Sequence, residues 1–215
     1  MRLKHVKGAN EIIEKGTFYL QPLEEYKGAW HKIFNNNNPI YIEIGMGKGD
    51  FIIENAIKYP NINFIGIEKF DSVLVRAIQK SNELELKNLK LIRMDANNID
   101  KIFSKEISLI YLNFSDPWPK DRHAKRRLTS PIFLQKYDFI FKNNPHIIMK
   151  TDNNSLFEYS LESLKENGYQ IISSTRDLYQ EDIKENIQTE YEKKFVKLGV
   201  KINRLEAIKY RLSTF

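Results

Sequence analysis

Short apolar runs alternate with longer amphipathic segments along most of this chain. Runs rich in Ile, Leu and Phe predict six strands, at 40–44, 63–67, 89–93, 109–113, 146–149 and 170–173. Between them, apolar residues that recur every three or four positions predict helices near 50–58, 71–86, 130–141 and 156–167. Strands and helices that alternate in this way indicate a parallel sheet with helices on both faces.

The two ends of the chain have a different pattern. A charged helix is predicted at 185–198 and a final strand at 200–210, which we expect to pair antiparallel at the edge of the sheet. Residues 1–36 form no clear unit and are interpreted as an N-terminal extension that ends in the polar tract at 35–38. Residues 37–215 are then expected to form one α/β domain, with a doubly wound, mostly parallel sheet of seven strands and an antiparallel edge strand.

Composition narrows the classes of protein that fit this pattern. The 215 residues include 41% hydrophobic and 29% charged residues, as in ordinary globular domains. No apolar run approaches the roughly 20 residues of a membrane span, and the N-terminus lacks the apolar stretch of a signal peptide, so we expect a cytoplasmic protein. The chain has no Cys and its four His are dispersed, so neither a disulfide nor a bound metal is expected.

The first chemical motif follows the strand at 40–44. It reads EIGMGKG from Glu43 onwards, and Gly45, Gly47 and Gly49 let the backbone approach a ligand closely. This G-x-G-x-G spacing differs from the G-x-G-x-x-G of a pyrophosphate-binding turn, and an acidic side chain is poorly placed beside a pyrophosphate. Both features favour a ligand with a positive amino or sulfonium group, such as S-adenosylmethionine. A tight turn without a ligand is the alternative.

Acidic residues also follow the next two predicted strands. Glu68 ends the run at 63–67, where nucleotide-binding folds of this kind place a carboxylate that accepts both ribose hydroxyls. Asp95 follows the strand at 89–93, in position to accept from the exocyclic amine of adenine. Helix capping by Asp95 or Asn97 is locally an equally good explanation. The order of glycine turn, ribose acid and adenine acid along successive strand ends indicates an adenosine pocket.

The segment at 113–128, NFSDPWPKDRHAKRRL, joins an acidic and aromatic loop to a dense cationic run. Five basic residues and one acidic residue between positions 120 and 127 give a net charge of +4, out of +6 for the whole chain. Charge clustered in this way favours a polyanion held by its phosphates, with one base presented to Asp116 and Trp118. A solvated surface loop is the alternative. The candidate phosphate contacts are Arg122, Lys125, Arg126 and Arg127.

Together these motifs resemble those of the bacterial tRNA (guanine-N7)-methyltransferases, a Rossmann-like family that depends on S-adenosylmethionine. The resemblance runs from about residue 41 to residue 210 and is most specific in EIGMGKGDF, GIEKF, LNFSDPWPKDRHAKRRL, MKTDN and TEYE. It implies that the domain at 37–215 transfers a methyl group to N7 of the guanosine conventionally numbered 46 in the variable loop of tRNA.

The resemblance also implies roles for individual residues. Asp116 is the expected catalytic residue. With it, the expected cofactor contacts are Glu43, Gly45, Gly47, Gly49, Glu68, Asp95 and Asn97. The expected substrate contacts are Lys120, Asp152, Thr189, Tyr191 and Glu192. Helix capping by Thr151 or Asp152 is the alternative at that position, and local reasoning alone favours a capping box for Thr189 with Glu192.

The chemistry implied by this resemblance depends on positioning. Guanine N7 already has an in-plane lone pair, so methyl transfer needs a near-linear approach to the methyl group rather than a strong base. We therefore expect Asp116 to stabilise the developing positive charge or to bind the N1/N2 edge of the guanine, and not to act as a general base.

Two other functions fit parts of the sequence. The tetrapeptide SDPW loosely resembles the D/N/S-P-P-aromatic motif of enzymes that methylate exocyclic amines, although the second proline is missing. The second alternative is a non-catalytic RNA-binding protein on a methyltransferase scaffold. The intact cofactor motifs argue against it. The sequence indicates tRNA as partner, no membrane and no required protein partner, and it leaves monomer and homodimer open.

Overall fold

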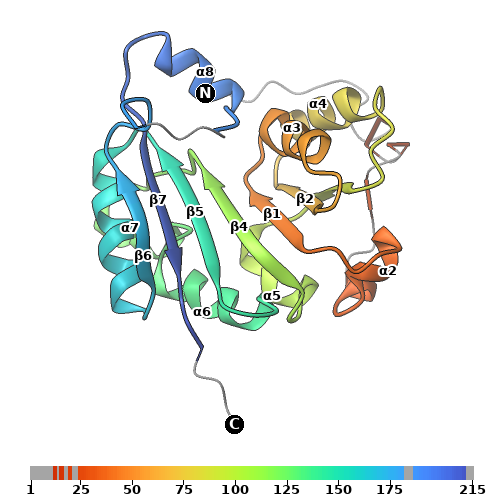
Figure 1. Ribbon diagram of the computed structural model, residues 1–215, viewed down its shortest axis with the longest axis horizontal. Helices are drawn as coiled ribbons and strands as arrows, with labels where there is room; N and C mark the ends of the chain where they lie inside the picture. Colours follow the sequence, from red (N-terminus) through yellow and green to blue (C-terminus); the bar gives the residue numbers. More distant parts are fainter. Residues whose placement is uncertain (1–11, 14, 17–18, 21–23, 182–185, 212–215) are drawn as a thin grey trace.

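A seven-stranded sheet forms the centre of the protein (Figure 1). The computed structural model describes residues 12–13, 15–16, 19–20, 24–181 and 186–211. The strand order is β3-β2-β1-β4-β5-β7-β6. The strands are β1 (Ile40–Ile44), β2 (Asn63–Glu68), β3 (Leu89–Arg93), β4 (Ile107–Asn113), β5 (His146–Thr151), β6 (Gln170–Thr175) and β7 (Asn203–Ile208). The first five strands are parallel, and β7 is antiparallel to both β5 and β6. The predicted α/β sheet, mostly parallel with an antiparallel edge, is confirmed.

The final strand lies one place further in than we expected. β7 is inserted between β5 and β6, so that β6 is the outermost strand. Leu205 and Ala207 of β7 are fully buried, whereas Ile172, Ser173 and Ser174 of β6 are exposed. A strand that buries its apolar residues is stabilised by partners on both sides, and the more polar β6 is better suited to the solvent-exposed edge.

Helices cover both faces of the sheet. α3 (Asp50–Lys58) and α4 (Asp71–Ser81) pack on β2 and β3, and α5 (Ile99–Ile102), α6 (Pro131–Ile140) and α7 (Asn154–Glu166) lie on the other face (Figure 1). Phe64 belongs to the core beneath α3 and α4, while its neighbour Ile65 belongs to the opposite core, because successive strand residues point to opposite faces. No helix in this described part is long and apolar enough to cross a membrane.

The remaining elements are short. They are η1 (Glu24–Tyr26), α2 (Trp30–Phe34), η2 (Ala96–Asn98), η3 (Asp121–Arg126) and α8 (Glu190–Val196). The sequence did not predict α2, α5 or the three 3₁₀ helices, since one to two turns carry too little periodicity. The charged helix predicted at 185–198 is the shorter α8, and residue 185 lies outside the described residues.

The helix predicted at 71–86 ends early, at Ser81. The backbone N–H of Leu84 donates to the Ser81 carbonyl (2.9 Å), which turns the chain out of the helix. The buried side chain of Asn88 then donates to the Ala56 carbonyl on α3 (3.0 Å) and directs the chain into β3. A local turn and one tertiary bond thus override the helical pattern of the sequence.

The described residues of the predicted N-terminal extension contact the core of the domain. Trp30 is fully buried, and its indole Nε1 donates to the Ile102 carbonyl (3.1 Å). The carboxylate of Glu106 accepts from the backbone N–H of Trp30 (2.9 Å). Tyr19 forms a parallel β-bridge with Leu91 of β3. The division into extension and domain stays a prediction, but α2 shares the core of the domain.

Trp30→Ala should lower the free energy of unfolding by about 3–5 kcal/mol, because it leaves a large cavity and removes an indole hydrogen bond. Urea unfolding at equilibrium measures this. Ile57→Ala is the control, because Ile57 is 55% exposed on α3 and its loss should cost at most about 0.5 kcal/mol. A Trp30→Ala protein as stable as the wild type would exclude α2 from the cooperative core.

Candidate active site

The glycine turn lies at the edge of the sheet where β1, β2, β4 and β5 end, below α8 in the view of Figure 1. Gly45 and Gly47 have φ of +78° and +59°, a region that favours glycine. The N–H of Gly45 donates to the Ile67 carbonyl (2.9 Å), which fastens the turn to β2. A Cβ on either glycine would meet nothing within 4 Å. The turn therefore borders open space in which a ligand can approach the backbone.

Gly49 has a different structural role in this turn. It precedes α3 with φ of +80°, and a Cβ there would lie 2.8 Å from the Cβ of Ala77 on α4. The absence of a side chain at Gly49 thus allows α3 and α4 to pack closely. A cofactor contact by Gly49 stays a prediction.

Glu43 is buried in β1, with 1% of its surface exposed. Its Oε1 accepts from Asn113 Nδ2 at the end of β4 (2.9 Å). Its Oε2 and the Oδ1 of Asn113 are buried acceptors without a hydrogen-bond partner among the described residues. Burial raises the pKa of Glu43 to about 8, although Asn113 and the charge of Lys150 act in the opposite direction. Two such acceptors on adjacent strands are suited to a ligand group rich in N–H donors.

Sequence reasoning missed Asn113. The signal in the sequence was a single amide that ends an otherwise apolar strand. Its pairing with Glu43 depends on β1 and β4 being neighbours in the sheet, although 69 residues of sequence separate the two side chains.

Glu68 supports the glycine turn from the end of β2. One carboxylate oxygen accepts from the N–H of Gly47 (3.1 Å), and the other accepts from the N–H groups of Lys69 (2.8 Å) and Phe70 (3.0 Å). Burial raises the pKa of Glu68, and these three bonds partly offset the effect. A carboxylate has about four acceptor positions, so room remains for a ribose hydroxyl. The predicted ribose contact itself stays a prediction.

Asp95 caps the short helix η2, which confirms the capping interpretation for this residue. Its Oδ1 accepts from the backbone N–H (2.9 Å) and the side-chain amide (2.8 Å) of Asn97, and its Oδ2 lies 2.6 Å from Lys69 Nζ. Burial alone would raise the pKa of Asp95, but the hydrogen bonds from Lys69 and Asn97 hold it below its usual value. The adenine contacts expected of Asp95 and Asn97 stay predictions.

Asp116 is exposed in the loop between β4 and η3. The loop is bounded by two non-glycine residues with left-handed backbone, Phe114 (φ +51°) and Trp118 (φ +42°). Burial has the largest effect on the pKa of Glu68, and backbone hydrogen bonds come next. The negative charge of Asp116 also raises this pKa, with a smaller effect. The predicted catalytic residue therefore lies close enough to a predicted cofactor residue for their charges to interact.

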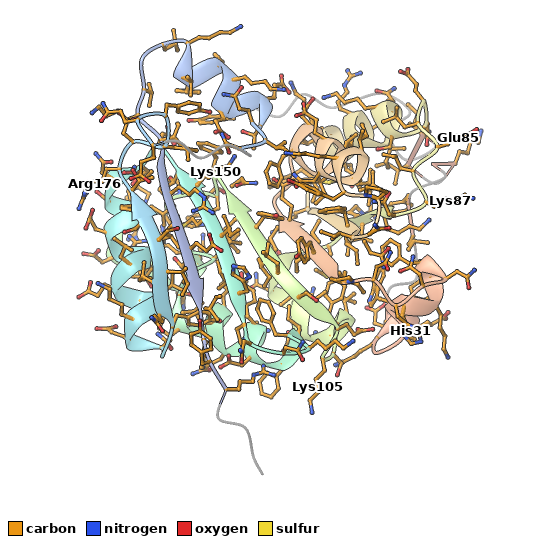
Figure 2. The ribbon with its side chains drawn as sticks, in the orientation of Figure 1. His31, Glu85, Lys87, Lys105, Lys150 and Arg176 are labelled. Atoms are coloured by element: carbon orange, nitrogen blue, oxygen red, sulfur yellow. The ribbon has the colours of Figure 1, made fainter. Side chains whose placement is uncertain are left out.

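A buried ion pair fastens α8 over this edge. Lys150 Nζ, at the end of β5, lies 2.5 Å from Glu192 Oε2, and the two side chains are 3% and 0% exposed. Figure 2 shows Lys150 at the upper end of the sheet, below α8. Burial lowers the pKa of Lys150, while the charge of Glu192 acts in the opposite direction. Sequence reasoning missed Lys150, although a lysine that ends a buried strand is itself a signal for a buried partner.

The predicted capping box of Thr189 and Glu192 is confirmed. The N–H of Glu192 donates to Thr189 Oγ1 (2.9 Å), and the N–H of Thr189 donates to Glu192 Oε2 (3.3 Å). Glu192 Oε1 accepts from the hydroxyl of Tyr179 (2.6 Å). Both oxygens of Glu192 are thus bonded within the protein, and its predicted contact with guanine stays a prediction.

Tyr191 joins α8 to the end of β5. Its hydroxyl donates to Asp152 Oδ2 (3.0 Å), and its ring stacks on Phe195 (4.1 Å between centroids) and lies 5.0 Å from Phe114. The ring is 41% exposed. The structure thereby brings two predicted substrate residues, Tyr191 and Asp152, next to the loop that carries Asp116.

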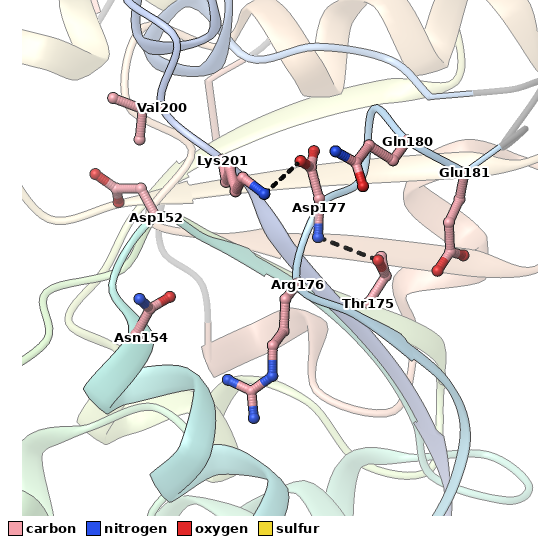
Figure 3. A pocket seen from close by; sticks show the side chains of 9 residues that line it. All are labelled: Asp152, Asn154, Thr175, Arg176, Asp177, Gln180, Glu181, Val200 and Lys201. Atoms are coloured by element: carbon pink, nitrogen blue, oxygen red, sulfur yellow. Dashed lines mark hydrogen bonds and ion pairs between the residues drawn. The ribbon is translucent and has the colours of Figure 1, made fainter.

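A hollow of about 710 Å³ opens beside Asp152 (Figure 3). Arg176 and Lys201 contribute to its lining, and Lys201 pairs with Asp177 (3.3 Å). Carboxylate, amide and cationic side chains share this lining, which suits a polar occupant better than an apolar one.

The basic segment divides into an exposed group and one buried residue. Arg127 is only 9% exposed. Its Nε donates to the Pro117 carbonyl (3.1 Å) and its Nη2 to the Trp118 carbonyl (3.0 Å). The guanidinium of Arg126 lies 4.8 Å from the Trp118 ring centroid. The exposed members are Lys120, Arg122, Lys125 and Arg126. The phosphate contacts of Arg122, Lys125, Arg126 and Arg127 stay predictions, and the burial of Arg127 leaves little of its side chain within reach of a phosphate.

The fold and the polar strand ends define a class I methyltransferase architecture. Solved structures with a similar fold include an antibiotic-related methyltransferase, with a TM-score of 0.66 and 16% identity over 92% of this chain and 98% of that one. Another is a 16S rRNA methyltransferase, with a TM-score of 0.63 and 10% identity over 86% and 94%. At these identities the similarity establishes the fold alone.

The sequence relationship is more specific. Residues 37–205 match the family model described as putative methyltransferase. A protein of Lachnoclostridium phytofermentans named tRNA (guanine-N(7)-)-methyltransferase is 50% identical over 97% of this chain and 99% of its own. One of the same name from Listeria monocytogenes is 49% identical over 96% and 98%. The chain belongs to the tRNA (guanine-N7)-methyltransferase family, which confirms the resemblance noted in the sequence.

Glu43→Gln should change the pH dependence of stability. Because the pKa of Glu43 is about 8 in the folded protein and about 4.3 when unfolded, folding keeps a proton on Glu43 between those values. The contribution of Glu43 to the free energy of unfolding is fully present below about pH 4. It falls by about 1.4 kcal/mol per pH unit between there and about pH 8. Gln is neutral and nearly isosteric, so it avoids this loss.

Thermal melts of the ligand-free protein from pH 5 to 8.5 measure the difference. The excess stability of Glu43→Gln should be smallest at pH 5 and largest at pH 8.5. Glu85→Gln, in the exposed segment between α4 and β3, is the control and should differ from the wild type by the same amount at every pH. A constant difference for Glu43→Gln as well would contradict a protonated Glu43.

Proposed function

We propose that this protein transfers a methyl group from S-adenosylmethionine to N7 of the guanosine conventionally numbered 46 in the variable loop of tRNA. The observation that carries the proposal is the identity of about half of all residues to proteins of this name, over nearly the full length of both chains. The geometry supports it, because acidic groups suited to a nucleoside cofactor and cationic groups suited to a polyanion lie near the same edge of the sheet.

The cofactor site proposed here fits S-adenosylmethionine. The unpaired oxygens of Glu43 and Asn113 would accept from its ammonium group, and Gly45 and Gly47 leave room for it beside the backbone. The other residues that would hold it are Gly49, Glu68, Asp95, Asn97 and Asp116. The cofactor supplies an electrophilic methyl group. The protein's part is to orient it and to exclude water.

The guanine would lie between the Asp116 loop and the end of β5. Guanine N7 needs no deprotonation, so the surrounding residues act by position and charge. Asp116 would stabilise the positive charge that develops on the purine, or hold its N1/N2 edge. Asp152, Tyr191, Thr189 and Glu192 would complete the substrate site, with Glu192 acting chiefly through its ion pair with Lys150, which holds α8 at the end of β5.

The exposed cationic group would hold the tRNA backbone. Lys120, Arg122, Lys125 and Arg126 follow the Asp116 loop directly, so phosphates bound there would place a nearby base at the loop. We also infer that the protein works in the cytoplasm, as a monomer or homodimer and without a required protein partner.

The reaction product tests the proposal. Purified protein, a tRNA transcript and S-adenosylmethionine should yield 7-methylguanosine, detected by mass spectrometry of the digested nucleosides against isomeric standards. A transcript with adenosine at position 46 is the control and should remain unmethylated. Methylation of an exocyclic amine would support the first alternative, and cofactor-independent tRNA binding without any product would support a non-catalytic protein.

Asp116→Asn should slow single-turnover methyl transfer by about a hundredfold at saturating cofactor and tRNA. Asn keeps the shape and an acceptor but loses the negative charge, and loss of one preorganised electrostatic group has effects of this size. Melting temperature and tRNA affinity serve as controls and should change little. A near-normal transfer rate would remove the catalytic role from Asp116 and leave the proposed reaction intact.

A further inference from the structure

Arg127 differs from its basic neighbours in what it contacts. Its planar guanidinium donates to two consecutive carbonyls, those of Pro117 (3.1 Å from Nε) and Trp118 (3.0 Å from Nη2). On its other side it lies 4.2 Å from the ring centroid of Tyr159 on α7. The side chain is therefore held between the Asp116 loop and a helix of the core, with its charge directed at the protein interior.

The loop that Arg127 contacts needs support from outside. Pro117 and Pro119 have no N–H, so the segment offers carbonyls but few donors with which to hold itself. Phe114 and Trp118 also have positive φ, a conformation that persists in non-glycine residues when the surroundings enforce it. At the start of the loop the N–H of Phe114 donates to the Lys150 carbonyl (2.8 Å). At the end of the loop the two donors of the Arg127 guanidinium fork, Nε and Nη2, bind the backbone carbonyls.

We propose that Arg127 is a positioning residue, which fixes the loop from Phe114 to Trp118 so that Asp116 faces the reacting groups, and that it is not one of the phosphate contacts. The exposed Arg126, next to it in sequence, has the phosphate role. The proposal rests on the proposed function for its effect on methyl transfer, but the placement of the loop can be tested without activity.

Lysine cannot replace such a fork. Its ammonium group keeps the charge but has rotatable donors on a flexible chain, so it does not match two consecutive carbonyls. A phosphate contact, in contrast, tolerates Lys because mainly the charge matters. Arg127→Lys and Arg126→Lys therefore make the same change at adjacent positions, and the larger loss of transfer is expected at position 127, where two carbonyls lose their donor.

The first experiment compares transfer with tRNA binding. Arg127→Lys should slow single-turnover transfer at least tenfold at saturating cofactor and tRNA, while Arg126→Lys, which keeps the charge, should slow it by a clearly smaller factor. The charge-removing variants separate the roles again. Arg126→Gln should reduce the slope of log affinity for tRNA against log salt by about 0.7 to 0.9, and Arg127→Gln should leave it unchanged. Wild-type transfer by Arg127→Lys, or an equal loss of slope in both Gln variants, overturns the proposal.

The second experiment measures the environment of Trp118 in the loop without an activity assay. The chain has two Trp residues, so protein labelled with 5-fluorotryptophan gives two ¹⁹F signals, assigned with Trp118→Phe. In Arg127→Lys the Trp118 signal should shift or broaden, while the signal of the buried Trp30 stays in place and reports that the core is folded. An unmoved Trp118 signal overturns the proposal even if the wild-type protein has no methyltransferase activity, and missing activity alone counts only against the proposed function.

Tyr159→Leu provides the test if Arg127→Lys does not fold. It removes the ring behind the guanidinium and leaves the fork in place. Transfer should slow by a smaller factor and the Trp118 signal should move in the same direction. A wild-type rate together with an unmoved Trp118 signal in this variant overturns the proposal.

Discussion

Parallel pairing of β1 with both β2 and β4 is the constraint on which the site depends. Because parallel strands all end at the same edge, Glu43, Glu68 and Asn113 meet there although they are far apart in the sequence. The glycine turn is then fixed from two sides, by the Ile67 carbonyl and by the carboxylate of Glu68. The same geometry that satisfies the backbone thus gathers the polar groups that a charged nucleoside requires.

This edge also concentrates buried charge, which costs free energy unless it is paired. Lys150 and Glu192 offset that cost through their ion pair and the bonds from Tyr179 and Thr189. Removal of one partner from such a pair typically costs about 3–5 kcal/mol, because the other charge stays buried. Glu43, in contrast, has one oxygen without a partner among the described residues, and burial raises its pKa to about 8. The protein therefore pairs the buried charges beneath α8 and leaves an unpaired acceptor where a ligand is expected.

The parts of the structure that local pattern determines were predictable from the sequence. β1, β3 and α3 have the predicted bounds, and the capping box of Thr189 with Glu192 was visible because all its groups lie within four residues. What depends on distant partners was not predictable: the early end of α4, the insertion of β7, and the burial of Lys150 and Arg127. Arg127 looks like its neighbours in a cationic run, and only the positions of the Pro117 carbonyl and Tyr159 distinguish it.

The position of β7 has a consequence for the order in which the protein can assemble. β6 precedes β7 in the chain, yet in the described structure β6 joins the sheet through β7. During synthesis β6 therefore has no partner strand in the sheet until residues 203–208 have been made. The segment with α8 lies between these two strands, so it is fixed at both ends only when β7 has docked. The α8 part of the site can thus be completed only once β7 has docked.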